Sequence, residues 1–198
     1  MSHQVMYSAT MPASPFALDE TRTIARLMLN YDSRYDVRAA VHEENLLKVK
    51  SLSNEKKLFN YIYNRLEQFP DELKEILING DENDSRYVNF VSIMAYDRLF
   101  MEFVYDVYAS KRINGDPITD YDVMSFFEKV AAHSEQVSEW KYETVFKLRR
   151  LYTRVLFETG LLKTSSGCRD LSKPFVSDST INVLKKFGYE AIVRATLG

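Results

Sequence analysis

The residues that could perform catalysis do not form any arrangement that a known class of enzyme requires. The sequence contains no Gly-rich phosphate loop, no Gly-x-Ser-x-Gly turn, no His-Glu-x-x-His helix and no Cys-x-x-Cys pair. It has 28 Asp and Glu residues, so close pairs such as Asp81 with Asp84 or Asp120 with Asp122 are expected by chance. We interpret these pairs as solvated acids of loops and helix starts rather than as general acids and bases. We therefore expect no catalytic residue and no enzymatic activity.

Residues that bind metals are also few and scattered. Cys168 is the only cysteine, and His3, His42 and His133 show no ligand spacing with it or with one another. A single cysteine cannot close a disulfide within the chain. We expect no metal site and no cofactor.

The most informative chemical pattern is a line of positive charges on one predicted helix, over residues 138–159. Lys147, Arg150 and Arg154 stand at positions i, i+3 and i+7, so they share one face of the helix. We call these three residues the basic stripe, and Arg149 lies beside it. A negatively charged partner would relieve their mutual repulsion, although solvent and salt would do the same.

The helix carries a main apolar face on another side, and two large aromatic residues lie away from it. These are Phe146 and Phe157. Their position indicates that the helix packs against a second neighbour, which limits how much of it can enter a groove.

The residues that follow this helix predict a small two-stranded wing. Segments 161–164 and 172–176 flank a Ser-Ser-Gly turn and are expected to pair. The order helix, strand, turn, strand is that of a winged helix, and Lys163, Arg169 and Lys173 would lie on the wing. In that motif the helix before the wing enters the major groove of DNA while the wing contacts the backbone.

The distribution of charge supports a polyanionic partner for the C-terminal region. Residues 139–198 hold 11 Lys and Arg against 6 Asp and Glu, whereas residues 71–138 hold 6 against 14. Double-stranded DNA is the partner that we expect. Two alternatives stay open: a protein–protein adaptor, since a basic face could also dock on an acidic protein surface, and an RNA-binding helical protein.

The elements that must position these residues are predicted to be helices. Glycine (6) and proline (5) are scarce and fall where helices should end. The stretch 87–109 is apolar on nearly every face, so we expect it to form one central helix whose aromatic residues pack in the core rather than stack bases. The other predicted helices cover residues 19–30, 32–44, 53–69, 71–78, 119–132 and 178–187, followed by a short final segment.

Length and composition fit a folded protein with a substantial core. The chain has 198 residues, 45% of them hydrophobic, and a net charge of −2. We expect a mainly α fold, with a helical bundle over residues 1–115 and a winged-helix-like region over residues 116–198, or one compact unit. The longest uncharged stretch after the N-terminal residues, 87–96, is too short to span a bilayer, so we expect a cytoplasmic protein without a membrane partner.

Short sequence signatures spread over most of the chain resemble the BrxA family of BREX bacteriophage-exclusion systems. They are Ser14-Pro15-Phe16, Glu43 to Leu47 leading through Ser51 to Asn64-Arg65-Leu66, Leu148 to Leu151, and Glu158 to Leu162. The resemblance implies a non-catalytic role in phage defence beside other BREX proteins. It also implies a helical fold likened to the antitermination factor NusB, and binding to double-stranded DNA. It supplies no DNA-contact motif, so the expected contacts rest on charge and helix geometry. They are Lys147, Arg149, Arg150, Arg154, Lys163, Arg169 and Lys173.

Overall fold

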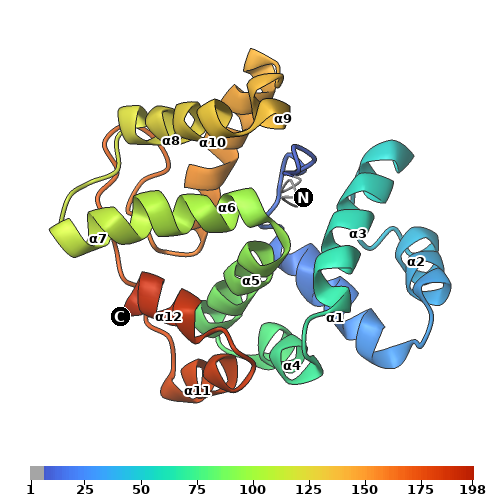
Figure 1. The fold of residues 1–198 in the computed structure, drawn as a ribbon. Helices are drawn as coiled ribbons and strands as arrows, with labels where there is room; N and C mark the ends of the chain where they lie inside the picture. The colour runs from blue at the N-terminus through green and yellow to red at the C-terminus, as the bar shows by residue number, and fades with distance from the viewer. Residues whose placement is uncertain (1–6) are drawn as a thin grey trace, which may run out of the picture. The chain divides into compact units, whose positions relative to one another are not determined.

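The structure, a computed structural model, describes residues 7–198, and its regular structure is helical, as predicted (Figure 1). His3 lies outside the described residues. No helix in the described range is both long and apolar enough to cross a membrane. The elements in chain order are α1 (Leu18–Asn30), α2 (Arg34–Glu43), α3 (Leu52–Glu67), α4 (Asp71–Asn79), α5 (Glu82–Tyr96), α6 (Arg98–Phe103), the π-helix η1 (Val104–Ala109), α7 (Ser110–Asn114), α8 (Asp120–His133), α9 (Glu135–Ser138), α10 (Tyr142–Glu158), α11 (Asp178–Lys186) and α12 (Glu190–Leu197).

Two compact units divide the chain, and each is assembled from separate stretches of sequence. Unit 1 contains the residues up to Met11, Met94–Pro174 and Arg194–Gly198, and unit 2 contains Pro12–Ile93 and Phe175–Val193. The boundary predicted after residue 115 falls inside unit 1.

Unit 2 is organised around a buried arginine on α3. Arg65 is 3% exposed, and its guanidinium donates to the carbonyl oxygen of Pro15 at 2.9 Å, to Thr21 Oγ1 at 2.5 Å and to Asn89 Oδ1 at 2.7 Å. Burial lowers the pKa of Arg65 to about 10, and the side chain still keeps its charge at neutral pH. Buried polar groups of this kind must be hydrogen-bonded to be tolerated, so Arg65 fixes the segment before α1 against α3 and α5.

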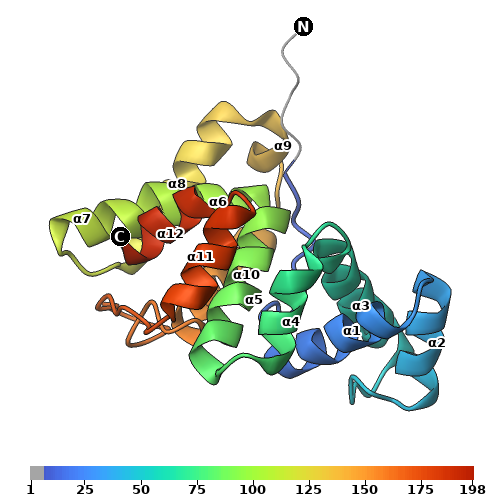
Figure 2. The same ribbon diagram turned by 90° about the horizontal axis from the view of Figure 1, so that it is seen from below.

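A buried carboxylate also anchors α11 within unit 2. Asp84 on α5 accepts hydrogen bonds from the backbone N–H of Ser177 at 2.8 Å and from the hydroxyls of Ser177 and Thr180 at 2.6 and 2.9 Å. Ser177 is the N-cap of α11, so Asp84 holds the start of that helix, and α11 lies beside α4 (Figure 2). The expectation that Asp84 is a solvated loop acid is wrong, because its side chain is buried.

The core of unit 1 is a cluster of aromatic rings. Tyr152 on α10 packs against Phe100 and Phe103 of α6 and against Phe127 of α8, with ring centroids 5.0 to 5.5 Å apart. Phe126 closes the cluster against Phe103 at 5.3 Å. Such pairs add to the free energy already gained by burying the rings. The cluster fixes α6, α8 and α10 relative to one another, and core packing is confirmed for the aromatic residues of α6.

The single helix predicted over residues 87–109 is wrong. α5 ends at Tyr96, Asp97 adopts an extended backbone, and the Asp97 side chain accepts a hydrogen bond from the backbone N–H of Phe100 at 2.9 Å as the N-cap of α6. The π-helix Val104–Ala109 then continues directly from α6, and α7 follows in the same line (Figure 1). An N-cap residue inside an apolar run therefore starts a new helix.

Asp97 makes the stability of the fold depend on pH. Burial raises the pKa of Asp97 to about 6, against an ordinary value of 3.8. The folded state therefore binds this proton more tightly than the unfolded state, so its stabilising effect is full below pH 4 and is lost as pH rises through about 6. Asp97→Asn keeps an oxygen that can cap α6 and has no charge to bury. We expect it to unfold at a higher urea concentration than the parent protein at pH 7, by about 1–3 kcal/mol in free energy.

Urea unfolding curves of the two proteins at pH 4, 5, 6 and 7 measure the effect of the Asp97 carboxyl group alone, because both proteins contain all the other titratable groups. The difference in unfolding free energy should shrink toward zero at pH 4. A difference that does not change with pH would contradict the buried, proton-retaining state of Asp97.

The predicted two-stranded wing is wrong, and with it the winged helix. Within residues 7–198 no strand forms. The chain around segments 161–164 and 172–176 is joined by an isolated bridge between Leu162 and Leu171 and by a hydrogen bond from the backbone N–H of Ser172 to the carbonyl oxygen of Leu161 at 2.9 Å. The guanidinium of Arg169 binds two carbonyl oxygens of the intervening turn, at 3.1 and 2.8 Å. The Arg169 side chain thus adds to the short backbone pairing at the base of this loop, where two paired strands would supply a longer ladder of hydrogen bonds.

Candidate nucleic-acid interface

α10 of unit 1 is amphipathic, with one face buried and one face exposed. Lys141 is the N-cap of α10 and has an extended backbone, and Glu143 lies in the first turn. A negative charge at this position interacts favourably with the helix dipole. The apolar face packs into the core of unit 1 through Leu148, Leu151, Tyr152, Val155 and Leu156. The opposite face is the candidate interface.

The basic stripe of Lys147, Arg150 and Arg154 lies on the exposed face of α10. Two of the three charges have a hydrogen-bond or ion-pair partner. Lys147 Nζ donates to the carbonyl oxygen of Met11 at 2.8 Å, and Arg154 Nε lies 3.0 Å from Glu158 Oε1 one turn away. An exposed ion pair one turn apart is worth about 0.3–0.5 kcal/mol, so Arg154 can exchange Glu158 for a stronger anion at little cost.

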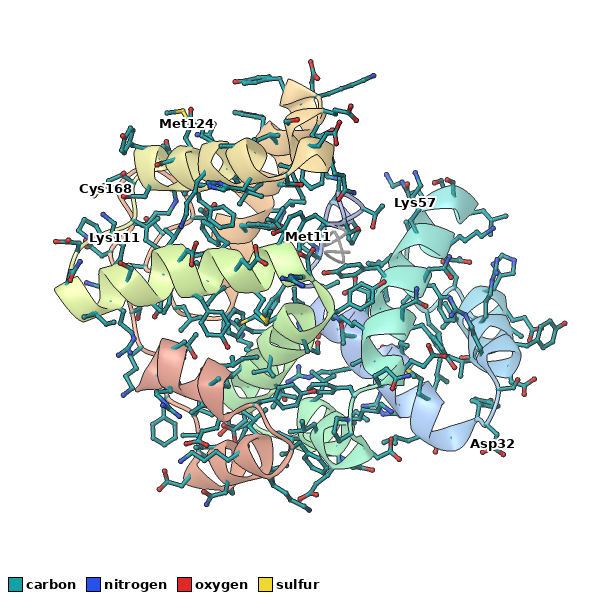
Figure 3. The ribbon with its side chains drawn as sticks, in the orientation of Figure 1. Met11, Asp32, Lys57, Lys111, Met124 and Cys168 are labelled. Carbon is teal, nitrogen blue, oxygen red and sulfur yellow. The ribbon has the colours of Figure 1, made fainter. Side chains whose placement is uncertain are left out.

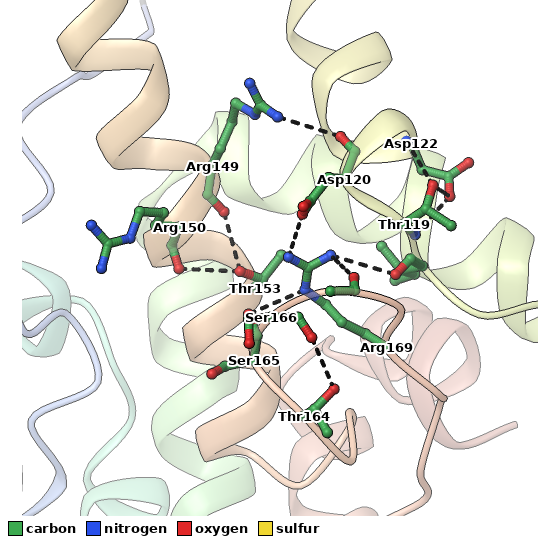
Figure 4. Close-up of polar contacts among 12 residues, drawn as sticks. Thr119, Asp120, Asp122, Arg149, Arg150, Thr153, Thr164, Ser165, Ser166 and Arg169 are labelled. Atoms are coloured by element: carbon green, nitrogen blue, oxygen red, sulfur yellow. Dashed lines mark hydrogen bonds and ion pairs between the residues drawn. The ribbon is translucent and has the colours of Figure 1, made fainter.

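Arg149 and Arg169 are directed toward Asp120 rather than toward the basic stripe. Figure 4 shows both guanidinium groups approaching this residue, which begins α8, while the side chain of Arg150 points away from it. Arg169 Nη2 lies 2.6 Å from Asp120 Oδ1, and Arg149 Nη2 lies 3.4 Å from the Asp120 carbonyl oxygen. Arg169 is only 5% exposed, so its side chain has little surface available for a contact with DNA. Its hydrogen bonds instead stabilise the loop that follows α10.

The two lysines after α10 are exposed and lie beside a cavity of about 540 Å³. Lys163 Nζ is 3.8 Å from Asp170 Oδ2, and Lys173 shares the cavity wall with Arg112. Arg112 donates to backbone carbonyl oxygens at the end of α12. Because acids and bases alternate around it, the cavity does not present a single sign of charge. Lys163 and Lys173 are therefore peripheral candidates for phosphate contact.

Aromatic residues on the exposed face of α10 are a candidate functional feature that sequence reasoning missed. Tyr142 is 72% exposed, Phe146 is 44% exposed and Phe157 is 43% exposed, so the expectation that Phe146 and Phe157 pack against a second neighbour is wrong. We call Tyr142, Phe146 and Phe157 the aromatic face. The signal was present in the sequence, because an i, i+4 run of Tyr142, Phe146 and Arg150 lies off the apolar face at 100° per residue.

Other chemistry finds little support among the residues that the structure describes. No group of three or more His, Cys, Asp or Glu side chains within residues 7–198 is placed to hold a metal ion. His42 pairs with Glu55 at 3.0 Å on the surface of unit 2. Cys168 is exposed, in the loop that follows α10 (Figure 3).

Comparisons with known proteins agree over nearly the whole chain. The family model described as BrxA matches residues 5–188. A protein named BREX protein BrxA from Bacillus cereus (strain H3081.97) is 30% identical over 189 residues, which cover 95% of this chain and 94% of the relative. A protein of the same name from Paramagnetospirillum magneticum is 23% identical over 189 residues, which cover 95% of this chain and 94% of that relative. The crystal structure of an uncharacterized protein from Magnetospirillum magneticum has the same fold, with a TM-score of 0.83, 22% identity, and coverage of 96% of this chain and 98% of that one.

Proposed function

The chain belongs to the BrxA family, and from that premise we propose that it is a non-enzymatic, double-stranded DNA-binding component of a BREX phage-defence system. The BREX assignment follows from the family. DNA binding is the finer part of the proposal and is argued from the exposed face of α10.

The observation that carries DNA binding is the basic stripe on one exposed helix face. Three cations spread over seven residues span about 10 Å along the helix axis. Four successive phosphates of one DNA strand, spaced about 3.4 Å apart along the duplex axis, cover a similar length. Lys147, Arg150 and Arg154 can therefore each approach a different phosphate, and such contacts supply affinity without reading sequence. We accordingly propose weak sequence preference.

A salt titration of duplex binding tests this function directly. Five exposed cations are available, the basic stripe together with Lys163 and Lys173. If each neutralises one phosphate, log affinity should fall with log salt concentration with a slope of about −4.5. The measurement is a gel shift of a 20-bp duplex at several concentrations between 50 and 200 mM salt. No binding at 50 mM, or binding that does not change with salt, would contradict the proposal.

An adaptor role within the defence complex is the second candidate, and a specific observation favours it. Unit 1 exposes large apolar side chains away from α10, with Ile113 at 77% and Tyr121 at 69% exposure. Exposed apolar groups of this kind often mark protein contacts. Co-purification with another BREX protein, combined with no duplex binding at low salt, would favour this role over DNA binding.

A further inference from the structure

The aromatic face and the basic stripe occupy the same side of α10. Relative to Phe146, Phe157 lies about 20° around the helix axis, and Tyr142 and Arg150 lie about 40° to either side. The rings of Tyr142 and Phe146 are stacked, with centroids 6.0 Å apart and planes inclined by 22°. The guanidinium carbon of Arg150 lies 6.0 Å from the centroid of Phe146. Tyr142, Phe146 and Arg150 thus form a row of flat groups along an exposed helix.

We propose that this row binds unpaired bases of DNA by stacking, so that the α10 face prefers single-stranded DNA, or single-stranded stretches next to duplex, over an intact duplex. The inference rests on the proposed DNA-binding function and names the form of DNA that the interface prefers.

Intact duplex DNA gives the aromatic face little to bind. In a duplex the faces of the bases are covered by their neighbours, and a protein that stays outside the stack reaches only base edges and the backbone. The basic stripe can contact duplex phosphates, whereas exposed rings beside it gain nothing from that contact. An unpaired base offers an open π-face, and stacking on an aromatic side chain then adds affinity for any base.

The chemistry of the same helix face favours nucleic acid over a protein partner. From Glu143 to Glu158 the exposed face holds three cations, Lys147, Arg150 and Arg154, against the two glutamates at its ends. Aromatic side chains interleaved with arginine around a positively charged track are the combination used by proteins that bind single strands without sequence preference. A protein interface of aromatic residues would instead have few charges at its centre.

The test compares three labelled ligands by fluorescence anisotropy at 100 mM salt. They are a 20-nucleotide oligothymidylate, a 20-unit abasic oligomer with the same phosphates and no bases, and a 20-bp duplex. The parent protein is compared with the double variant Tyr142→Leu, Phe146→Leu, which removes both rings from an exposed surface and keeps residues that favour a helix.

We expect the parent protein to bind oligothymidylate about 100-fold more tightly than the abasic oligomer, at about 10-fold for each stacked base. The double variant should bind the two single strands equally, while its affinity for the duplex stays within about 3-fold of the parent. This pattern would support stacking of unpaired bases.

Three other outcomes would overturn the inference. Equal affinity of the parent protein for oligothymidylate and the abasic oligomer would show that the bases are not contacted, and the proposed function would survive if the duplex is still bound. Equal losses for all three ligands in the double variant would mean that the rings do not discriminate unpaired bases. If no DNA is bound and sedimentation shows a dimer that the double variant dissociates, the face joins two copies of this chain and the proposed function fails as well.

Discussion

Replacing Arg169 with alanine is expected to lower the free energy of unfolding by about 3 kcal/mol, whereas Arg150→Ala should change it by less than about 0.5 kcal/mol. Both residues are arginines of the same basic region, and the sequence offers no reason to treat them differently. The structure places Arg169 at 5% exposure and Arg150 on the exposed face of α10.

The large loss of stability expected for Arg169→Ala follows from the number of hydrogen bonds that the Arg169 side chain makes. Its guanidinium donates to the carbonyl oxygens of Ser165 and Gly167 and to the carboxylate of Asp120. Hydrogen bonds from a charged donor are worth more than neutral ones. After their loss the loop would keep the backbone hydrogen bonds between residue 169 and Ile118 but would lose its contact with Asp120 at the start of α8. Asp120 is largely solvent-exposed, so water can screen it after the change, and this limits the loss to less than that of a fully buried ion pair.

Urea unfolding of both variants at neutral pH, followed by circular dichroism, measures these differences. Arg150→Ala should weaken duplex binding more than Arg169→Ala, because Arg150 is available to phosphate and Arg169 is not. An Arg169→Ala protein of unchanged stability that binds duplex as poorly as Arg150→Ala would contradict the supporting role assigned to Arg169.

The helices were predictable because their start signals are local. Ser33 caps α2 and Thr119 caps α8 through a capping box, within one residue of the starts predicted for these helices at 32 and 119. The third predicted helix, 53–69, starts one residue later than α3, because Ser51 is the N-cap. Start signals of this kind depend on residues within one turn of each other, so the sequence alone contains them.

The parts that sequence reasoning missed depend on contacts between distant residues. Whether Arg169 faces solvent depends on Asp120, 49 residues earlier in the chain. Asp97 ends one helix and starts another inside an apolar run, and the pattern of apolar residues around it is the same for one long helix as for two. The exposure of Phe146 depends on which elements pack around α10, and helix periodicity states only that the residue lies off the main apolar face.

Neutralising two members of the basic stripe should weaken duplex binding severely. We expect Arg150→Gln combined with Arg154→Gln to raise the dissociation constant about 200-fold at 50 mM salt and about 20-fold at 200 mM salt. These factors follow because each phosphate contact contributes about 15-fold at the lower concentration and about 4-fold at the higher one through release of counterions. The salt slope should become less steep by about 1.8. Glutamine keeps a good helix former at both positions, so unfolding curves should remain close to those of the parent.

The matched control removes two exposed cations from a helix of unit 2. Lys56 and Lys57 lie on α3 and are exposed, and Figure 3 labels Lys57. Lys56→Gln with Lys57→Gln changes the net charge by the same amount. If general attraction between a charged protein and DNA sets the affinity, both double variants should lose it equally. If α10 contacts the phosphates, the α3 variant should stay within about 3-fold of the parent and keep its salt slope. If the α3 variant loses more duplex affinity than the α10 variant and also has the less steep salt slope, the interface lies on unit 2. The slope identifies the contact because only a cation that displaces counterions there changes it.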